Sequence, residues 1–225
     1  MVLGALSLVA IVANRRHRQE MARLQTLATR PEAPNWPGPA EVAPARQAAI
    51  EYARSILRTP YDPLMGMYGD PLGRVGLVVC IDVPIRAYQA GGVSLPLLLK
   101  DTARAHPEIF DIGPNNSPSN PFFFRRVRNY APLFQRHPLL LSSKEPRPGD
   151  MAFYGGFHIA LVIEVRKDGS FDVIEASPRK GHVAVSDGAY MERTWGKPAF
   201  FGRIRDGGTD ILRPHEVVRM VPLFK

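Results

Sequence analysis

The chain has 225 residues, of which 45% are hydrophobic and 22% charged, a composition typical of a globular protein. This length allows one substantial domain with an extension and is short for two full domains. The net charge of +8 at pH 7 favours anionic partners, such as an anionic membrane surface or a cell-wall polymer. Basic residues without a nucleic-acid-binding fingerprint do not indicate a nucleic-acid partner. The single cysteine excludes an intramolecular disulfide, and histidines and carboxylates do not cluster at ligand spacing, so we expect no metal and no cofactor.

The N-terminal region divides into an apolar segment, residues 1–13, and a basic helix with a proline-rich linker, residues 14–43. The apolar segment is shorter than the about 20 residues that span a bilayer, and its length suits the apolar region of a signal peptide. No basic region precedes it, however, and the basic residues follow it, as they do on the cytoplasmic side of a membrane helix. We therefore expect a signal or anchor segment and a location in the cell envelope, either exported or membrane-anchored.

Residues 44–206 form the expected domain, and residues 207–225 form a C-terminal tail. Amphipathic spacing and glycine or proline boundaries predict helices first and short strands afterwards. The expected helices cover residues 45–57, 80–90 and 95–106, and the expected strands cover 151–154, 158–165, 171–176, 182–185 and 199–205. This order predicts an α+β fold in which the helices pack on a small antiparallel sheet.

Cys80 lies where an apolar run turns into the second of these helices. A thiol at a helix N-terminus meets the positive end of the helix dipole and unpaired backbone N–H groups, which favour the thiolate. Cys80 is therefore a candidate nucleophile. A buried core cysteine is the alternative, because free cysteines are among the most buried residues.

A cysteine nucleophile needs a base, and His158 at the start of an apolar strand is the best placed histidine for that role. The turn at residues 167–170 predicts that the next strand runs back beside it, which brings Glu175 close to the imidazole. A carboxylate there would fix the tautomer of the histidine. The alternatives are a structural histidine at a strand end and a solvent-facing glutamate.

Several short motifs, in this order, resemble those of NlpC-type papain-like cysteine peptidases and amidases. Within that superfamily, the resemblance is to the bacterial domain-of-unknown-function family numbered 1287, over roughly residues 45–205. The motifs that carry it are Tyr61-Asp62-Pro63, Cys80-Ile81-Asp82-Val83, Ile85-Arg86-Ala87-Tyr88, Arg125-Arg126-Val127, Gly149-Asp150, His158-Ile159 and Ile174-Glu175-Ala176-Ser177.

This resemblance implies a papain-like fold with Cys80 as nucleophile, His158 as base and Glu175 as the residue that orients the base. NlpC-type enzymes most often have His, Asn or Gln at the third position, so Glu175 departs from their pattern. The implied reaction is hydrolysis of an amide bond in peptidoglycan or a related cell-wall peptide. The alternatives are an acyl-transfer or deamidase enzyme on the same scaffold and a non-catalytic, basic cell-envelope binding domain.

Three further residues are candidates for substrate binding. The resemblance implies that Tyr61 helps to shape the site and that Asp82 is the acidic residue two positions after the nucleophile. Asp82 also suits a helix-capping carboxylate. Arg86 suits either a contact with a substrate carboxylate or a solvent-facing position.

Overall fold

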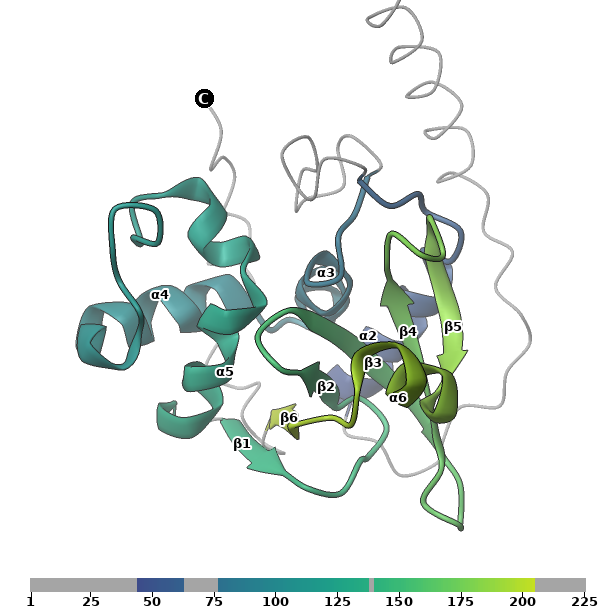
Figure 1. Cartoon of the computed structure of the whole chain (residues 1–225). Coiled ribbons are helices and arrows are strands. Elements are labelled where there is room, and N and C mark those ends of the chain that lie inside the picture. Colours follow the sequence, from purple (N-terminus) through teal and green to yellow (C-terminus); the bar gives the residue numbers. More distant parts are fainter. Residues whose placement is uncertain (1–43, 63–76, 138–139, 205–225) are drawn as a thin grey trace, which may run out of the picture.

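The computed structural model describes residues 44–62, 77–137 and 140–204 (Figure 1). The expected apolar segment, basic linker and C-terminal tail lie outside these residues, as does the end of the expected domain. Among the described residues, no helix has the length and apolar character needed to cross a membrane.

Helices lead the chain and strands dominate its second half. The helices are α2 (Pro44–Ser55), α3 (Asp82–Ala90), α4 (Leu95–Ala105), α5 (Val127–Arg136) and α6 (Gly188–Trp195), with short 3-10 helices η1 (Pro107–Ile109) and η2 (Pro121–Arg125). The strands are β1 (Leu140–Ser143), β2 (Met151–Tyr154), β3 (His158–Val165), β4 (Phe171–Ala176), β5 (Val183–Asp187) and β6 (Phe200–Ile204). The strands form one six-stranded sheet in the order β1-β6-β2-β3-β4-β5, and every pair is antiparallel. The expected α+β class with an antiparallel sheet is therefore confirmed.

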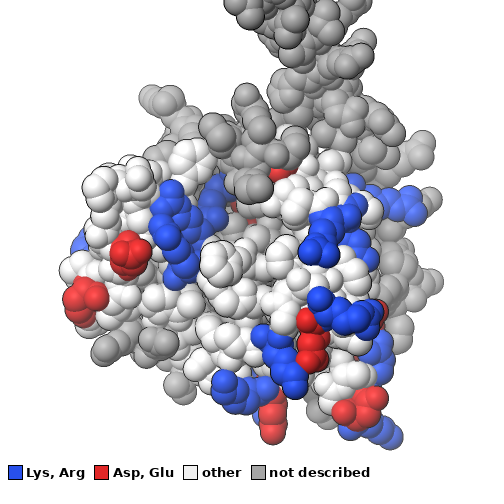
Figure 2. Space-filling model, viewed as in Figure 1, with Lys and Arg blue, Asp and Glu red and all other residues white. Residues whose placement is uncertain are grey.

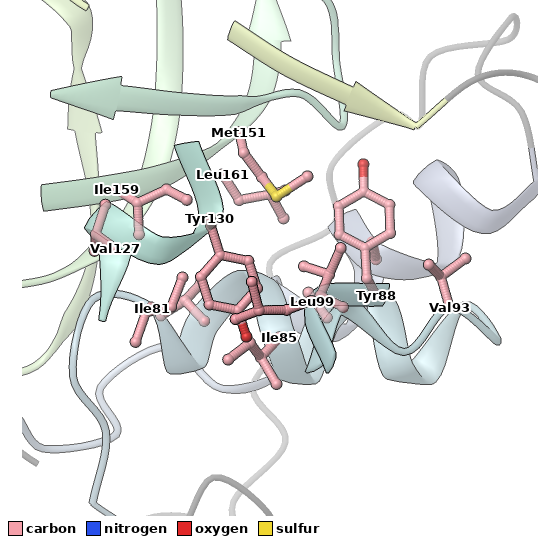
Figure 3. Packing of buried hydrophobic residues seen from close by; sticks show 14 of the residues in the cluster. Ile81, Ile85, Tyr88, Val93, Leu99, Val127, Tyr130, Met151, Ile159 and Leu161 are labelled. Atoms are coloured by element: carbon pink, nitrogen blue, oxygen red, sulfur yellow. The ribbon is translucent and has the colours of Figure 1, made fainter. Parts of the chain in front are cut away.

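The two faces of the sheet pack against different helices, because successive side chains of a strand point to opposite faces. Ile159 and Leu161 of β3 join the large core cluster, which also contains residues from α2 to α5. Figure 3 shows this packing around α3, with Ile81 and Ile85 lying near Tyr130 of α5. The residues between them, such as Ala160, join a smaller cluster with Met191 of α6. Helices α2 and α3 thus pack on one face of the sheet, and α6 covers the opposite face (Figure 1).

The close contact between α2 and α3 depends on a glycine. Gly91 ends α3, and a Cβ atom there would lie 2.5 Å from the carbonyl oxygen of Ala45 in α2. Any larger residue would push the two helices apart. This contact fixes α3, and with it the segment that carries Cys80, against the rest of the helical layer.

Helices α5 and α6 and strand β1 were not expected from the sequence. Helix α5 contains Pro132, which normally interrupts a helix because it lacks an N–H donor. Helix α6 is short, and Met191 is its only buried residue among those described, so it has no strong apolar periodicity. Its start is nevertheless capped, since the Asp187 carboxylate accepts a hydrogen bond from the N–H of Tyr190 at 2.7 Å.

Candidate active site

Cys80 lies at the end of the sheet where β3 and β5 begin. A parallel bridge joins Tyr61 to Val78, and the N–H of Tyr61 donates to the carbonyl oxygen of Gly181, just before β5, at 2.9 Å. The N–H of Val78 donates to the carbonyl oxygen of Pro60 at 3.1 Å. These bonds attach the segment before α3 to the sheet, and they bring the cysteine to the start of β3.

The thiol of Cys80 contacts the backbone on both sides of His158. It donates to the carbonyl oxygen of Phe157, with an Sγ–O distance of 3.9 Å, and the N–H of Ile159 also interacts with the sulfur. The side chain is partly buried. Cys80 therefore lies close to the His158 strand, as predicted, with its thiol hydrogen-bonded to the backbone.

The expectation that the helix start favours a thiolate is not met in this conformation. Burial is the main cause that raises the pKa of Cys80 to about 12, the negative charge of Asp82 acts in the same direction, and the N–H groups of Ile159, Ile81 and Cys80 oppose the shift. Cys80 also lies one residue before the N-cap, which is Ile81. Burial of the thiol and the Asp82 carboxylate in the first turn thus raise the pKa of Cys80 by more than the helix dipole lowers it.

His158 and Glu175 form the buried pair that the strand order predicts. The His158 Nε2 and Glu175 Oε2 atoms are 3.0 Å apart, although without the alignment of a hydrogen bond, and both side chains are almost fully buried. Burial alone would raise the pKa of Glu175. The contacts with His158 and Ser186 outweigh it and hold the pKa of this carboxyl below its ordinary value. Glu175 is thus an anion beside the imidazole.

Two residues of this site were missed in the sequence. The Ser186 hydroxyl in β5 donates to the other carboxylate oxygen of Glu175 at 2.8 Å. The Trp195 ring, at the end of α6, stacks on the His158 ring with the centroids 4.1 Å apart and the planes 8° apart. The contact of Ser186 could have been predicted, since the pairing of β4 with β5 puts Ser186 on the same face of the sheet as Glu175. The contact of Trp195 could not, because α6 itself was not expected.

Tyr61 lies close to Cys80 and remains protonated at neutral pH. Burial is the main cause that raises the pKa of the Tyr61 phenol to about 12, and the nearby Cys80 and Asp62 act in the same direction. Its hydroxyl group can therefore act as a hydrogen-bond donor near the cysteine.

Asp82 and Arg86 support the segment that carries Cys80. The Asp82 carboxylate is fully buried, accepts from the N–H of Val79 at 2.9 Å and pairs with the Arg125 guanidinium, whose Nε is 3.0 Å from Oδ1. Arg86 is 5% exposed and donates from Nη2 to the carbonyl oxygen of Leu77 at 3.0 Å. Of the two alternatives for Arg86, the solvent-facing position is wrong, and the positions of both side chains favour support of the loop over direct substrate contact.

The described residues contain no group of three or more His, Cys, Asp or Glu side chains that could hold a metal ion. They bring the His158 imidazole and the Glu175 carboxylate together, whereas the Cys80 thiol contacts the backbone on both sides of His158 and not its ring. Comparison with protein-family models and with curated proteins finds no match to this chain.

Proposed function

We propose that this protein is a papain-like cysteine hydrolase that cleaves an amide bond in peptidoglycan or a related cell-wall peptide. The observation that carries the proposal is the buried His158–Glu175 pair, at 3.0 Å, directly beside the backbone atoms that contact the Cys80 sulfur. A buried imidazole paired with a carboxylate next to a thiol is the arrangement that activates a cysteine nucleophile. The motif resemblance to NlpC-type enzymes supports the same reaction and the cell envelope as its location.

In the proposed reaction, each step involves particular atoms of the site. Because Nε2 of His158 faces Glu175, Nδ1 is the nitrogen left to take the proton from the Cys80 thiol, once the thiol turns away from the Phe157 carbonyl oxygen that it contacts in this structure. The thiolate attacks the amide carbonyl carbon, and the C–N bond breaks as the imidazolium protonates the leaving amine. Water then attacks the thioester, with His158 as its base, and releases the acid and the thiol.

The negative oxygen formed during attack needs hydrogen-bond donors. Backbone N–H groups at the start of α3 lie next to Cys80, and the protonated Tyr61 phenol is close to it. Removing one such donor typically slows acyl transfer by about 10² to 10³. Tyr61 therefore shapes the site as a donor in this proposal.

The first test compares the wild-type protein with Cys80→Ala and His158→Ala on purified peptidoglycan, with products identified by mass spectrometry. The wild type is expected to release peptide fragments, and both variants are expected to release none above background. Tyr52→Phe, which changes a partly buried tyrosine on α2, serves as a control that should retain activity. Equal product release by the wild type and Cys80→Ala would refute the proposal.

A non-catalytic binding domain with a structural cysteine is the second candidate. The raised pKa of Cys80, about 12, favours it, because a neutral thiol is a poor nucleophile. The two candidates differ in the pH dependence of iodoacetamide alkylation. If His158 accepts the thiol proton, the wild type is alkylated well below the ordinary thiol pKa of about 8.5, and His158→Ala only at high pH. Alkylation confined to high pH in both proteins would support the structural role.

An acyl-transfer enzyme or a deamidase would use the same nucleophile, so thiol labelling does not distinguish it from a hydrolase. The products do. Hydrolysis leaves a free acid, transfer to an added amine leaves a new amide, and deamidation of a side-chain amide releases ammonia without cutting the chain.

A further inference from the structure

The turn between β2 and β3 carries an exposed aromatic side chain beside the candidate nucleophile. Phe157 is 89% exposed, although its own carbonyl oxygen accepts the hydrogen bond from the Cys80 thiol. Single exposed hydrophobic residues are common on protein surfaces. Phe157 differs from other exposed hydrophobic residues in its position, because its carbonyl oxygen contacts the Cys80 sulfur and the next residue is His158.

This turn is held in one position. Tyr154 and His158 pair at the ends of β2 and β3, so the turn contains only the residues between them. Gly155 has a φ of 61°, a left-handed conformation that glycine adopts without strain. Gly156 packs on α5, where a Cβ atom would lie 3.3 Å from Cβ of Arg128. The Phe157 ring is therefore presented to solvent from a defined backbone and not from a loose loop.

The neighbouring segment at the start of α5 is basic and firmly anchored. The buried pair between Arg125 and Asp82 ties this segment to the first turn of α3. The Asn129 side chain donates to the carbonyl oxygen of Phe123 at 2.8 Å and to Asn116 Oδ1 at 2.9 Å.

Within this anchored segment, Arg128 is exposed, and none of the described carboxylates pairs with it. Figure 2 shows Lys and Arg side chains gathered over the segment that joins η2 to α5, beside a hollow between the helical part and the sheet part. An exposed guanidinium on an anchored helix suits a carboxylate, which it can bind through two parallel hydrogen bonds.

We propose that Phe157 and Arg128 are specificity-determining residues that select an amide substrate with a free carboxylate near the scissile bond. Phe157 packs against the apolar face of the acyl group or sugar next to the scissile carbonyl, and Arg128 binds the carboxylate. Arg128 packs beside the β2–β3 turn, and the Phe157 carbonyl oxygen in that turn contacts the Cys80 thiol. The inference rests on the proposed amide hydrolysis and adds the chemical class of the substrate, a peptide with a negatively charged carboxyl group.

The test uses two muropeptides that differ only in whether one stem carboxyl group is free or amidated. The wild type is expected to have the higher kcat/KM on the free carboxylate, and Arg128→Ala is expected to lose about tenfold on that substrate and almost nothing on the amidated one. Phe157→Ala is expected to lose about tenfold on both, mainly through KM. Exposed matched controls are Arg104→Ala on α4 and Ile112→Ala, which should leave both rates unchanged.

Binding of the same muropeptides to Cys80→Ala, alone and combined with each substitution, separates this inference from the proposed function. Absence of cleavage by the wild type would overturn the proposed hydrolysis, while selective binding lost on Arg128→Ala would still support the recognition residues. If neither Phe157→Ala nor Arg128→Ala changes cleavage or binding, the role of these two residues in recognition is wrong, while the proposed hydrolysis is unaffected.

Discussion

Glu175 is held from two strands, which gives its carboxylate one defined orientation beside the imidazole. His158 approaches one oxygen from β3, and the Ser186 hydroxyl donates to the other from β5. The carboxylate is fully buried, so each lost contact leaves a polar atom without solvent to replace it. Ser186 is thus a positioning residue that acts through Glu175.

Ser186→Ala is expected to lower stability by about 1–3 kcal/mol and to raise the pKa of Glu175 towards its ordinary value. A carboxyl group whose pKa is lowered by folding stabilises the folded state above its unfolded pKa, and this stabilisation is lost as the pH falls through its folded pKa. Because the folded pKa of Glu175 is higher in the variant, the variant should lose this stabilisation at a higher pH than the wild type. The acidic limb of kcat/KM should shift in the same direction. Urea unfolding and rate profiles from pH 3 to 7 measure both, and Ser186→Thr, which keeps the hydroxyl, is the control. Identical profiles for wild type and Ser186→Ala would contradict the assignment.

The contact between His158 and Glu175 could be predicted because a short turn between two antiparallel strands leaves few possible partners. The pKa of Cys80 could not, since it depends on burial and on the carboxylate of Asp82, and neither is visible in a sequence pattern. The partners of Asp82 and Arg86 could not be predicted either, because Arg125 and Leu77 contact them only through tertiary packing.

At the level of elements, the contact between α2 and α3 determines where the cysteine segment sits. Gly91→Ala would place a methyl group 2.5 Å from a backbone oxygen of α2, which cannot move as a side chain can. We expect a loss of about 1–3 kcal/mol in the free energy of unfolding, measured by urea denaturation. Gly113→Ala, at a glycine with open space around it, is the matched control. Equal stability of the two variants would show that α2 and α3 tolerate a wider spacing.

The elements also differ in how well they could be predicted from the sequence. Strands β3 and β4 were predicted with their observed bounds, because each combines an apolar run with a clear turn signal. Helix α6 was missed although it supplies Trp195, since a short helix with little buried surface has almost no periodic signal. The elements with the least apolar periodicity are thus the hardest to predict, even when they complete the site.

For the whole molecule, the net charge of +8 predicts electrostatic attraction to an anionic cell-wall polymer. Binding of Cys80→Ala to purified anionic cell walls should weaken several-fold between about 0.1 M and 1 M salt, as the Debye length falls from about 10 Å to about 3 Å. A cosedimentation assay measures this, with uncharged chitin as the control polymer. Binding that does not change with salt would show that the attraction is not electrostatic.

The stacking of Trp195 on His158 also gives the protein an internal optical reporter. The sequence contains two tryptophans, and the other one is Trp36, so Trp36→Phe leaves a single indole, in face-to-face contact with the imidazole. The emission of that variant would therefore report directly on whether this stack stays closed, without substrate and without any added dye.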